Sequence, residues 1–199
     1  MKHGLSKTIV LGIIAAWQLS AGVVTIASDT NTAGTSALTG LYWGETFLAA
    51  ASGNNLTFNF FSDSAATTPE ATGTLYLLSS EYLGTPSDLS SGTTGYLASV
   101  SASGGGVWTF PSVSLSAGTE YWVYVDAVQP TIYGGGAEVA NQGAYFSDLL
   151  TDPYFALDDT DVNFLATTDT GGSEGTPEPT TLLLMAPALL LVLRRRLTR

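Results

Sequence analysis

The sequence predicts an all-β fold, with two antiparallel sheets packed face to face as a β-sandwich whose strands follow a jelly-roll-like path. Short runs rich in β-branched and aromatic residues recur along the body of the chain, separated by Gly, Ser, Thr, Asn, Asp and Pro. No helical period interrupts these runs. The body, residues 28–168, is long enough for one domain that buries roughly two-thirds of its unfolded surface.

The clearest strand alternates strictly. Leu56, Phe58 and Phe60 fall on one face of an extended chain, and Thr57 and Asn59 fall on the other. The same reasoning predicts further strands along the body. They cover residues 46–48, 74–78, 96–100, 107–110, 120–126, 144–146, 154–157 and 161–166. Strands of this number and size fit two sheets.

Aromatic side chains are concentrated in the body. The region 28–176 holds all nine Tyr, all eight Phe and three of the four Trp, and the chain has no Cys. Rings and β-branched side chains therefore form the expected core. A domain of this size can be stable without disulfide bonds.

Charge is divided sharply along the chain. All six Lys and Arg lie near the two ends, whereas all seventeen Asp and Glu lie between Asp29 and Glu178. The region 28–178 contains no His either, so it cannot form a Ser-His-Asp or Cys-His site, a Schiff-base lysine, or a zinc site of nitrogen and sulfur ligands. It also has no cation to neutralise phosphates, so we expect no nucleic-acid partner.

Paired carboxylates are the one catalytic arrangement that the composition leaves open. A glycosidase needs two carboxyl groups about 5–9.5 Å apart. Glu120 and Asp126 share a face of the strongest predicted strand, but six extended positions separate them by about 20 Å. We therefore expect that the protein is not an enzyme.

Residues 1–27 are predicted to be a secretory signal peptide. Basic residues precede an apolar core at residues 9–17, which is shorter than the roughly 20 residues of a comfortable membrane span. A membrane anchor that is not cleaved is the alternative. The basic residues are Lys2, His3 and Lys7.

Two positions could be the end of this signal. Cleavage after Ala27 fits the preference for small residues, with Thr25 two positions before it. Ala21 is the second candidate. Cleavage after Ala27 would begin the mature domain at residue 28.

The C-terminal end has an ordered series of segments. A polar linker, residues 169–176, is too poor in apolar groups to fold. An apolar run at 182–193 follows, and as a helix it would span about 18 Å of a hydrocarbon core of about 30 Å. Flanking arginines that snorkel would make a single transmembrane helix possible. Because arginines tend to stay in the cytoplasm, the acidic body should face outward.

This order resembles the PEP-CTERM sorting signal of Gram-negative bacteria that secrete exopolysaccharide. The resemblance covers residues 177–199 and implies that exosortase, a membrane transpeptidase-like protease, recognises the motif and removes the tail. The membrane would then hold the chain only before processing. An ordinary membrane anchor is the alternative. The matching residues are Pro177, Glu178 and Pro179, followed after the apolar run by Arg194, Arg195 and Arg196.

The body is also similar to the choice-of-anchor ectodomains that often precede such tails. The matching stretches are residues 44–47, 115–123 and 161–167, which are strand-and-turn patterns. The resemblance implies no catalytic residues and no cofactor. Taken together with the sorting tail, the leading hypothesis is an exported, non-enzymatic protein of the cell envelope, outer surface or extracellular matrix, associated with exopolysaccharide.

An acidic run near the end of the body is a candidate calcium site. Acidic residues at alternate positions are typical of the first half of a calcium loop. The glycine and the closing glutamate of an EF-hand are absent, so only a looser Ca²⁺ site on a sheet edge remains, with an ordinary polar turn as the alternative. The residues are Asp158, Asp159 and Asp161.

Aromatic residues could instead form a platform for sugar rings. The candidates are Trp108, Trp122 and Tyr124, and the last two share one face of a strand. Packing in the core is the alternative for all three. A carbohydrate-binding, lectin-like module is therefore the second hypothesis for function.

Overall fold

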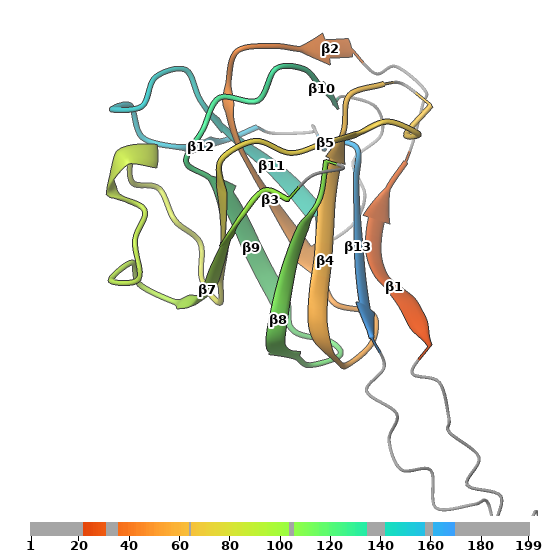
Figure 1. The fold of residues 1–199 in the computed structure, drawn as a ribbon. Coiled ribbons are helices and arrows are strands. Elements are labelled where there is room, and N and C mark those ends of the chain that lie inside the picture. Colours follow the sequence, from red (N-terminus) through yellow and green to blue (C-terminus); the bar gives the residue numbers. More distant parts are fainter. Residues whose placement is uncertain are drawn as a thin grey trace, which may run out of the picture.

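The structure is a computed structural model that describes residues 22–30, 36–63, 65–103, 106–134, 142–157 and 161–169. These residues form an all-β fold in which every strand pair is antiparallel (Figure 1). Within these ranges the one helical element is a 3-10 turn, η1 (Pro86–Asp88). The predicted all-β class is confirmed.

The described strands form two larger sheets and one small ribbon. The first sheet contains, in order, β1 (Val23–Asp29), β13 (Phe164–Asp169) and β4 (Gly53–Phe61), and β4 also pairs with β5 (Pro69–Glu70) and β8 (Trp108–Leu115). The second sheet has the order β12 (Phe155–Ala156), β11 (Gln142–Ser147), β3 (Tyr42–Leu48), β9 (Glu120–Val125), β6 (Thr74–Leu78) and β7 (Tyr96–Ser101). The ribbon pairs β10 (Ile132–Gly134) with β2 (Ser36–Leu38).

The two larger sheets face each other across an aromatic core, which gives a sandwich-like architecture. Phe47 of the second sheet contacts Phe58 and Phe164 of the first, with ring centroids 6.0 Å and 6.2 Å apart. Phe58 and Phe164 stack on neighbouring strands at 5.3 Å. The apolar face predicted for β4 is confirmed, since Leu56, Phe58 and Phe60 are all fully buried; on the other face Thr57 is half-buried and Asn59 is buried.

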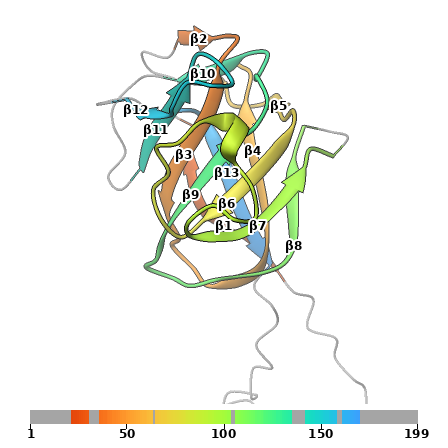
Figure 2. The ribbon, with the colours of Figure 1, turned by 90° about the vertical axis from the view of Figure 1, so that its left-hand side faces the viewer.

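A second layer covers the outer face of the second sheet. The connection between β6 and β7, which includes η1, lies in front of this sheet (Figure 2). Beneath it the buried Tyr124 packs against Tyr82, Tyr145 and Tyr154. Gly44 makes this possible, because a Cβ there would approach the Tyr124 ring to 2.4 Å. Both faces of the central strands are therefore buried.

The folded body extends beyond the expected range of 28–168 at both ends. β1 begins at Val23, inside the segment assigned to the signal peptide, and it pairs along β13. Its Ile26 side chain is 1% exposed and belongs to the main core. At the other end Asp169 is still part of β13. Both strand ends meet at one pole, where Val23 is paired with Asp169.

Most predicted strands are present with different bounds. The prediction for 74–78 matches β6, whereas β8 continues five residues beyond residue 110 and β13 begins three residues after residue 161. No helix within the described ranges is long and apolar enough to cross a membrane. Residues 1–21 and the expected sorting helix at 182–193 lie outside the described residues.

Replacing Phe58 with Ala should lower the free energy of unfolding by about 3–5 kcal/mol, because the ring contacts both sheets and its loss leaves a cavity. Chemical denaturation of the folded domain measures this. Leu83→Ala is the control, since Leu83 is 53% exposed and should change stability by about 0.5 kcal/mol or less. Equal losses for both variants would contradict the assignment of the core.

Candidate functional site

Three carboxylates among the described residues are buried inside the body. Asp29 ends β1, Glu45 lies in the middle of β3, and Asp161 precedes β13, with exposed fractions of 3%, 0% and 2%. Glu45 lies on the same side of its strand as Trp43 and Phe47, so its side chain points between the sheets. It is the least accessible acid of the three.

Backbone N–H groups partly compensate the Glu45 carboxylate. The N–H groups of Gly143 and Val162 donate to Oε1 and Oε2 at 3.0 Å and 3.4 Å. Burial nevertheless raises the pKa of Glu45 well above its usual range, and the nearby Asp161 and Asp29 carboxylates raise it further. No Lys, Arg or His occurs between residues 28 and 178 to oppose this. The fold therefore favours the protonated form of Glu45 over the carboxylate.

The candidate calcium residues are not brought together in the described part of the chain. Asp158 and Asp159 lie outside the described residues, whereas Asp161 is buried close enough to Glu45 to affect its pKa. In the ranges that the structure describes, no three His, Cys, Asp or Glu side chains converge to hold a metal ion. A calcium site at Asp158, Asp159 and Asp161 therefore stays a prediction.

The predicted sugar platform of Trp108, Trp122 and Tyr124 is not formed. Trp108 is fully buried between the sheets, where its Nε1 donates to the Gly73 carbonyl oxygen at 3.2 Å. Tyr124 is fully buried on the other side of the second sheet. A ring with no exposed surface cannot stack on a sugar. Trp122 alone is half-buried, and it does share the face of Tyr124 as predicted.

Hydroxyl groups form a row across the outer face of the first sheet. Thr25, Thr167, Thr57 and Thr109 are register partners in turn on β1, β13, β4 and β8. Neighbouring strands lie about 4.8 Å apart, so the row has a regular spacing. All four residues are exposed or half-buried. The row presents a series of hydroxyl groups to solvent.

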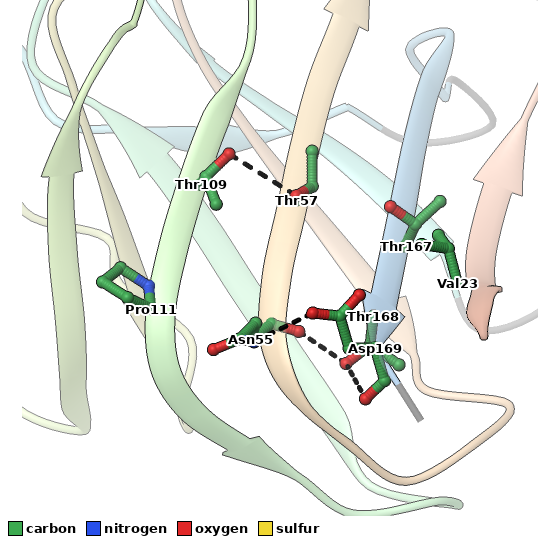
Figure 3. A pocket seen from close by; sticks show the side chains of 8 residues that line it. All are labelled: Val23, Asn55, Thr57, Thr109, Pro111, Thr167, Thr168 and Asp169. Atoms are coloured by element: carbon green, nitrogen blue, oxygen red, sulfur yellow. Dashed lines mark hydrogen bonds between the residues drawn. The ribbon is translucent and has the colours of Figure 1, made fainter. Parts of the chain in front are cut away.

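A shallow groove of about 210 Å³ follows this row toward the pole where β1 begins and β13 ends (Figure 3). Asn55 organises its floor: Nδ2 donates to Asp169 Oδ2 at 2.9 Å, and Oδ1 accepts from the Ser112 N–H at 2.7 Å. Both Asn55 and Ser112 have a positive φ, which marks a bulge between β4 and β8. The lining residues are Val23, Asn55, Thr57, Thr109, Pro111, Thr167, Thr168 and Asp169.

The groove offers hydrogen-bonding groups and no side chain suited to acid–base or nucleophilic chemistry beyond the Asp169 carboxylate, which is already bonded to Asn55. Sequence reasoning missed it because alternation places Thr57 on the outer face but does not say which strands lie beside it. The predicted sorting residues, 177–179 and 194–196, lie outside the described residues.

Comparison of the chain with protein-family models, with curated proteins and with solved structures found no match. A function for this chain must therefore be argued from its sequence and from the geometry of the described residues.

Replacing Glu45 with Gln should stabilise the fold progressively, relative to the unchanged protein, as pH rises above about 4.5. The pKa of Glu45 is higher in the folded state than the 4.5 of the unfolded chain. The unchanged protein therefore has the full stabilising contribution of Glu45 below pH 4.5, and it loses this contribution as the pH rises through the folded-state pKa. Each unit of pKa difference is worth about 1.4 kcal/mol. Urea unfolding of both proteins between pH 4 and pH 8 measures the difference.

Glu120→Gln is the matched control, because it also removes one carboxylate but at an exposed position on β9. A pH-dependent gain of the same size in both variants would show that general charge, and not the burial of Glu45, is responsible.

Sodium chloride should raise the melting temperature of the folded domain. Residues 28–178 carry 17 acids and no Lys or Arg, so charge repulsion weakens the compact state. Salt screens that repulsion, with a Debye length of about 10 Å at 0.1 M. A melting temperature that does not change between about 10 and 200 mM salt would contradict this.

Millimolar calcium at matched ionic strength separates screening from binding. A site at Asp158, Asp159 and Asp161 adds stability beyond that of sodium chloride, because an ion that binds only the folded state favours it. Equal melting temperatures in the two salts would show that these acids form no calcium site and belong to an ordinary polar turn.

Proposed function

We propose that this chain is an exported, non-enzymatic protein of the cell surface or extracellular matrix of a Gram-negative bacterium, with a jelly-roll-type sandwich domain. Exosortase sorts it, and the processed domain associates with exopolysaccharide. The observation that carries the proposal is the order of segments at the C-terminus: Pro177-Glu178-Pro179, the apolar run 182–193, and three arginines. Each segment alone is common, but their order at a C-terminus is specific.

The attachment of the tail to the fold supports this proposal. The tail follows β13, and Asp169, the last residue of that strand, precedes Pro177 by eight positions. β13 is paired with β1 on one side and with β4 on the other. A force applied to the tail therefore acts on a strand that is hydrogen-bonded along both edges, which suits a domain held in the membrane by its tail before processing.

The composition of the body supports a non-enzymatic role. Residues 28–178 have no His, Cys, Lys or Arg, and the buried Glu45 and Asp161 are closed to solvent. The polar groups that remain at the surface are hydroxyls and carboxylates, which can form hydrogen bonds with a ligand and can keep a domain soluble.

A carbohydrate-binding module is the second candidate, and the groove along Thr57, Thr109 and Thr167 favours it. Its hydroxyl, amide and carboxylate groups match the hydrogen-bonding chemistry of a sugar chain. This site differs from the aromatic platform expected from the sequence, since it lies on the first sheet and contains no ring other than Pro111.

Intact-mass measurement of the protein from a host with exosortase should show that the segment after the PEP motif, including Arg194–Arg196, has been lost. Glu178→Gln should retain the tail, because it changes the centre of the motif. Glu174→Gln, which removes a charge four residues earlier, should be processed normally. A mature product that ends at Arg199 in such a host would contradict the sorting proposal.

For the second candidate, the double variant Thr57→Val and Thr109→Val should weaken retention on the host exopolysaccharide. Valine keeps the shape of threonine but loses the hydroxyl, and a lost hydrogen bond costs about 1 kcal/mol, or roughly fivefold in affinity. Thr94→Val, in the exposed connection before β7, is the control. Equal retention of both variants on an affinity column would exclude the groove as the sugar site.

A further inference from the structure

The first described strand belongs fully to the domain. β1 has six register pairs with β13, and four of them involve residues 23–27. Ile26 contributes a buried side chain to the main core, and its carbonyl oxygen accepts from the Ala50 N–H at 2.8 Å. Strand pairing, core packing and a loop contact therefore all depend on the segment that precedes residue 28.

Cleavage after Ala27 would remove these contacts from the mature protein. The sheet would lose most of its first strand, and the stretch of β13 that pairs with residues 23–27, residues 166–169, would become an open edge. Such an edge presents unpaired N–H and C=O groups, a known hazard for aggregation. The cavity left by Ile26 would open the core beside the same edge.

Cleavage after Ala21 keeps all of this structure, because the mature chain then starts one residue before β1. Ala21 meets the requirement for a small residue at the cut, and it follows the apolar core at 9–17 by four positions, compared with ten for Ala27. The residue two positions earlier is the larger Leu19, compared with Thr25 for the other site. Local preference at that position favours Ala27, and the integrity of the fold favours Ala21.

We infer that signal peptidase cuts the chain between Ala21 and Gly22, so that the mature domain keeps β1 whole. This inference rests on the proposed export of the protein. The step is a peptide-bond hydrolysis: the Ala21–Gly22 bond breaks, and one water molecule supplies the hydroxyl of the new Ala21 carboxyl group and a proton to the new Gly22 amine.

The new terminus also changes the charge at the pole. The amine of Gly22 is an ammonium group below a pKa of about 8. Residues 22–178 contain no Lys, Arg or His, so this ammonium is their one positive charge. It lies one residue from Val23, the register partner of Asp169 in the groove. Processing thus creates a cation one residue from Val23, which lines the groove.

The test is the N-terminal sequence of the full chain after export by a Gram-negative host with exosortase. We expect Gly22 as the first residue. A mature protein that begins at Ser28, or an exported protein that keeps its N-terminus, would overturn the inference. If the protein begins at Gly22 but keeps Arg194–Arg199, the cleavage site stands and the sorting proposal fails.

One substitution made at both candidate sites gives a matched comparison. Ala21→Val places a branched side chain at the inferred cut and should reduce the mature fraction several-fold, so that the precursor accumulates. Ala27→Val should leave processing unchanged, because valine suits a strand and does not touch the cut. The ratio of precursor to mature protein is read on a gel and does not depend on stable folding. The reverse pattern would overturn the inference.

Discussion

The pairing of β13 between β1 and β4 is the interaction on which the rest of the structure depends. β13 is the last strand of the body, yet it lies inside the first sheet with partners along both edges. Its Phe164 and Ala166 complete the core against the second sheet. The complete sheet therefore requires the last strand of the body, and the first and last described strands then meet at one pole. The groove and the attachment of the tail share that pole.

A second constraint is the lack of cations in the body. Buried acids usually require a cationic partner, but Glu45 instead has two backbone N–H donors and a pKa that burial raises. Exposed acids are left to repel one another, which keeps the domain soluble at some loss of stability. In the role proposed above, at a surface rich in polysaccharide, this charge would make non-specific association with other anionic polymers unfavourable. If the mature chain begins at Gly22, its terminal ammonium group would be the one positive charge among residues 22–178.

Local patterns predicted the fold class, and long-range pairing explains what they missed. Strict alternation placed Phe58 and Phe60 in the core, and Trp122 and Tyr124 on one face. It could not show that the β6–β7 connection covers that face, so the buried Tyr124 was a candidate for a sugar platform. The segment with Val23, Val24 and Ile26 resembled the end of a signal peptide, because apolar residues followed by a small one occur in both settings. Only its register with β13 distinguishes them.

The two candidate sites, the groove and the proposed sorting signal, also differ in how far local sequence patterns can predict them. The threonine row consists of single residues from four strands, and β1 and β13 lie more than 100 positions apart in the chain. Each threonine alone is an ordinary outer-face residue, so no local motif marks the groove. The proposed sorting signal, in contrast, is contiguous, and the order of its segments can be read from the sequence without a fold.

Hydrogen exchange of the full chain tests the central claim most directly. If β1 is an integral strand, the amides of residues 23–29 that bond to β13 should exchange slowly, with protection comparable to that of β13 and β4. Exchange of residues 23–29 at the rate of an unfolded chain, while β13 and β4 stay protected, would contradict that claim. That result would be consistent with residues 23–27 belonging to the predicted signal peptide, and it would leave β13 as an edge strand.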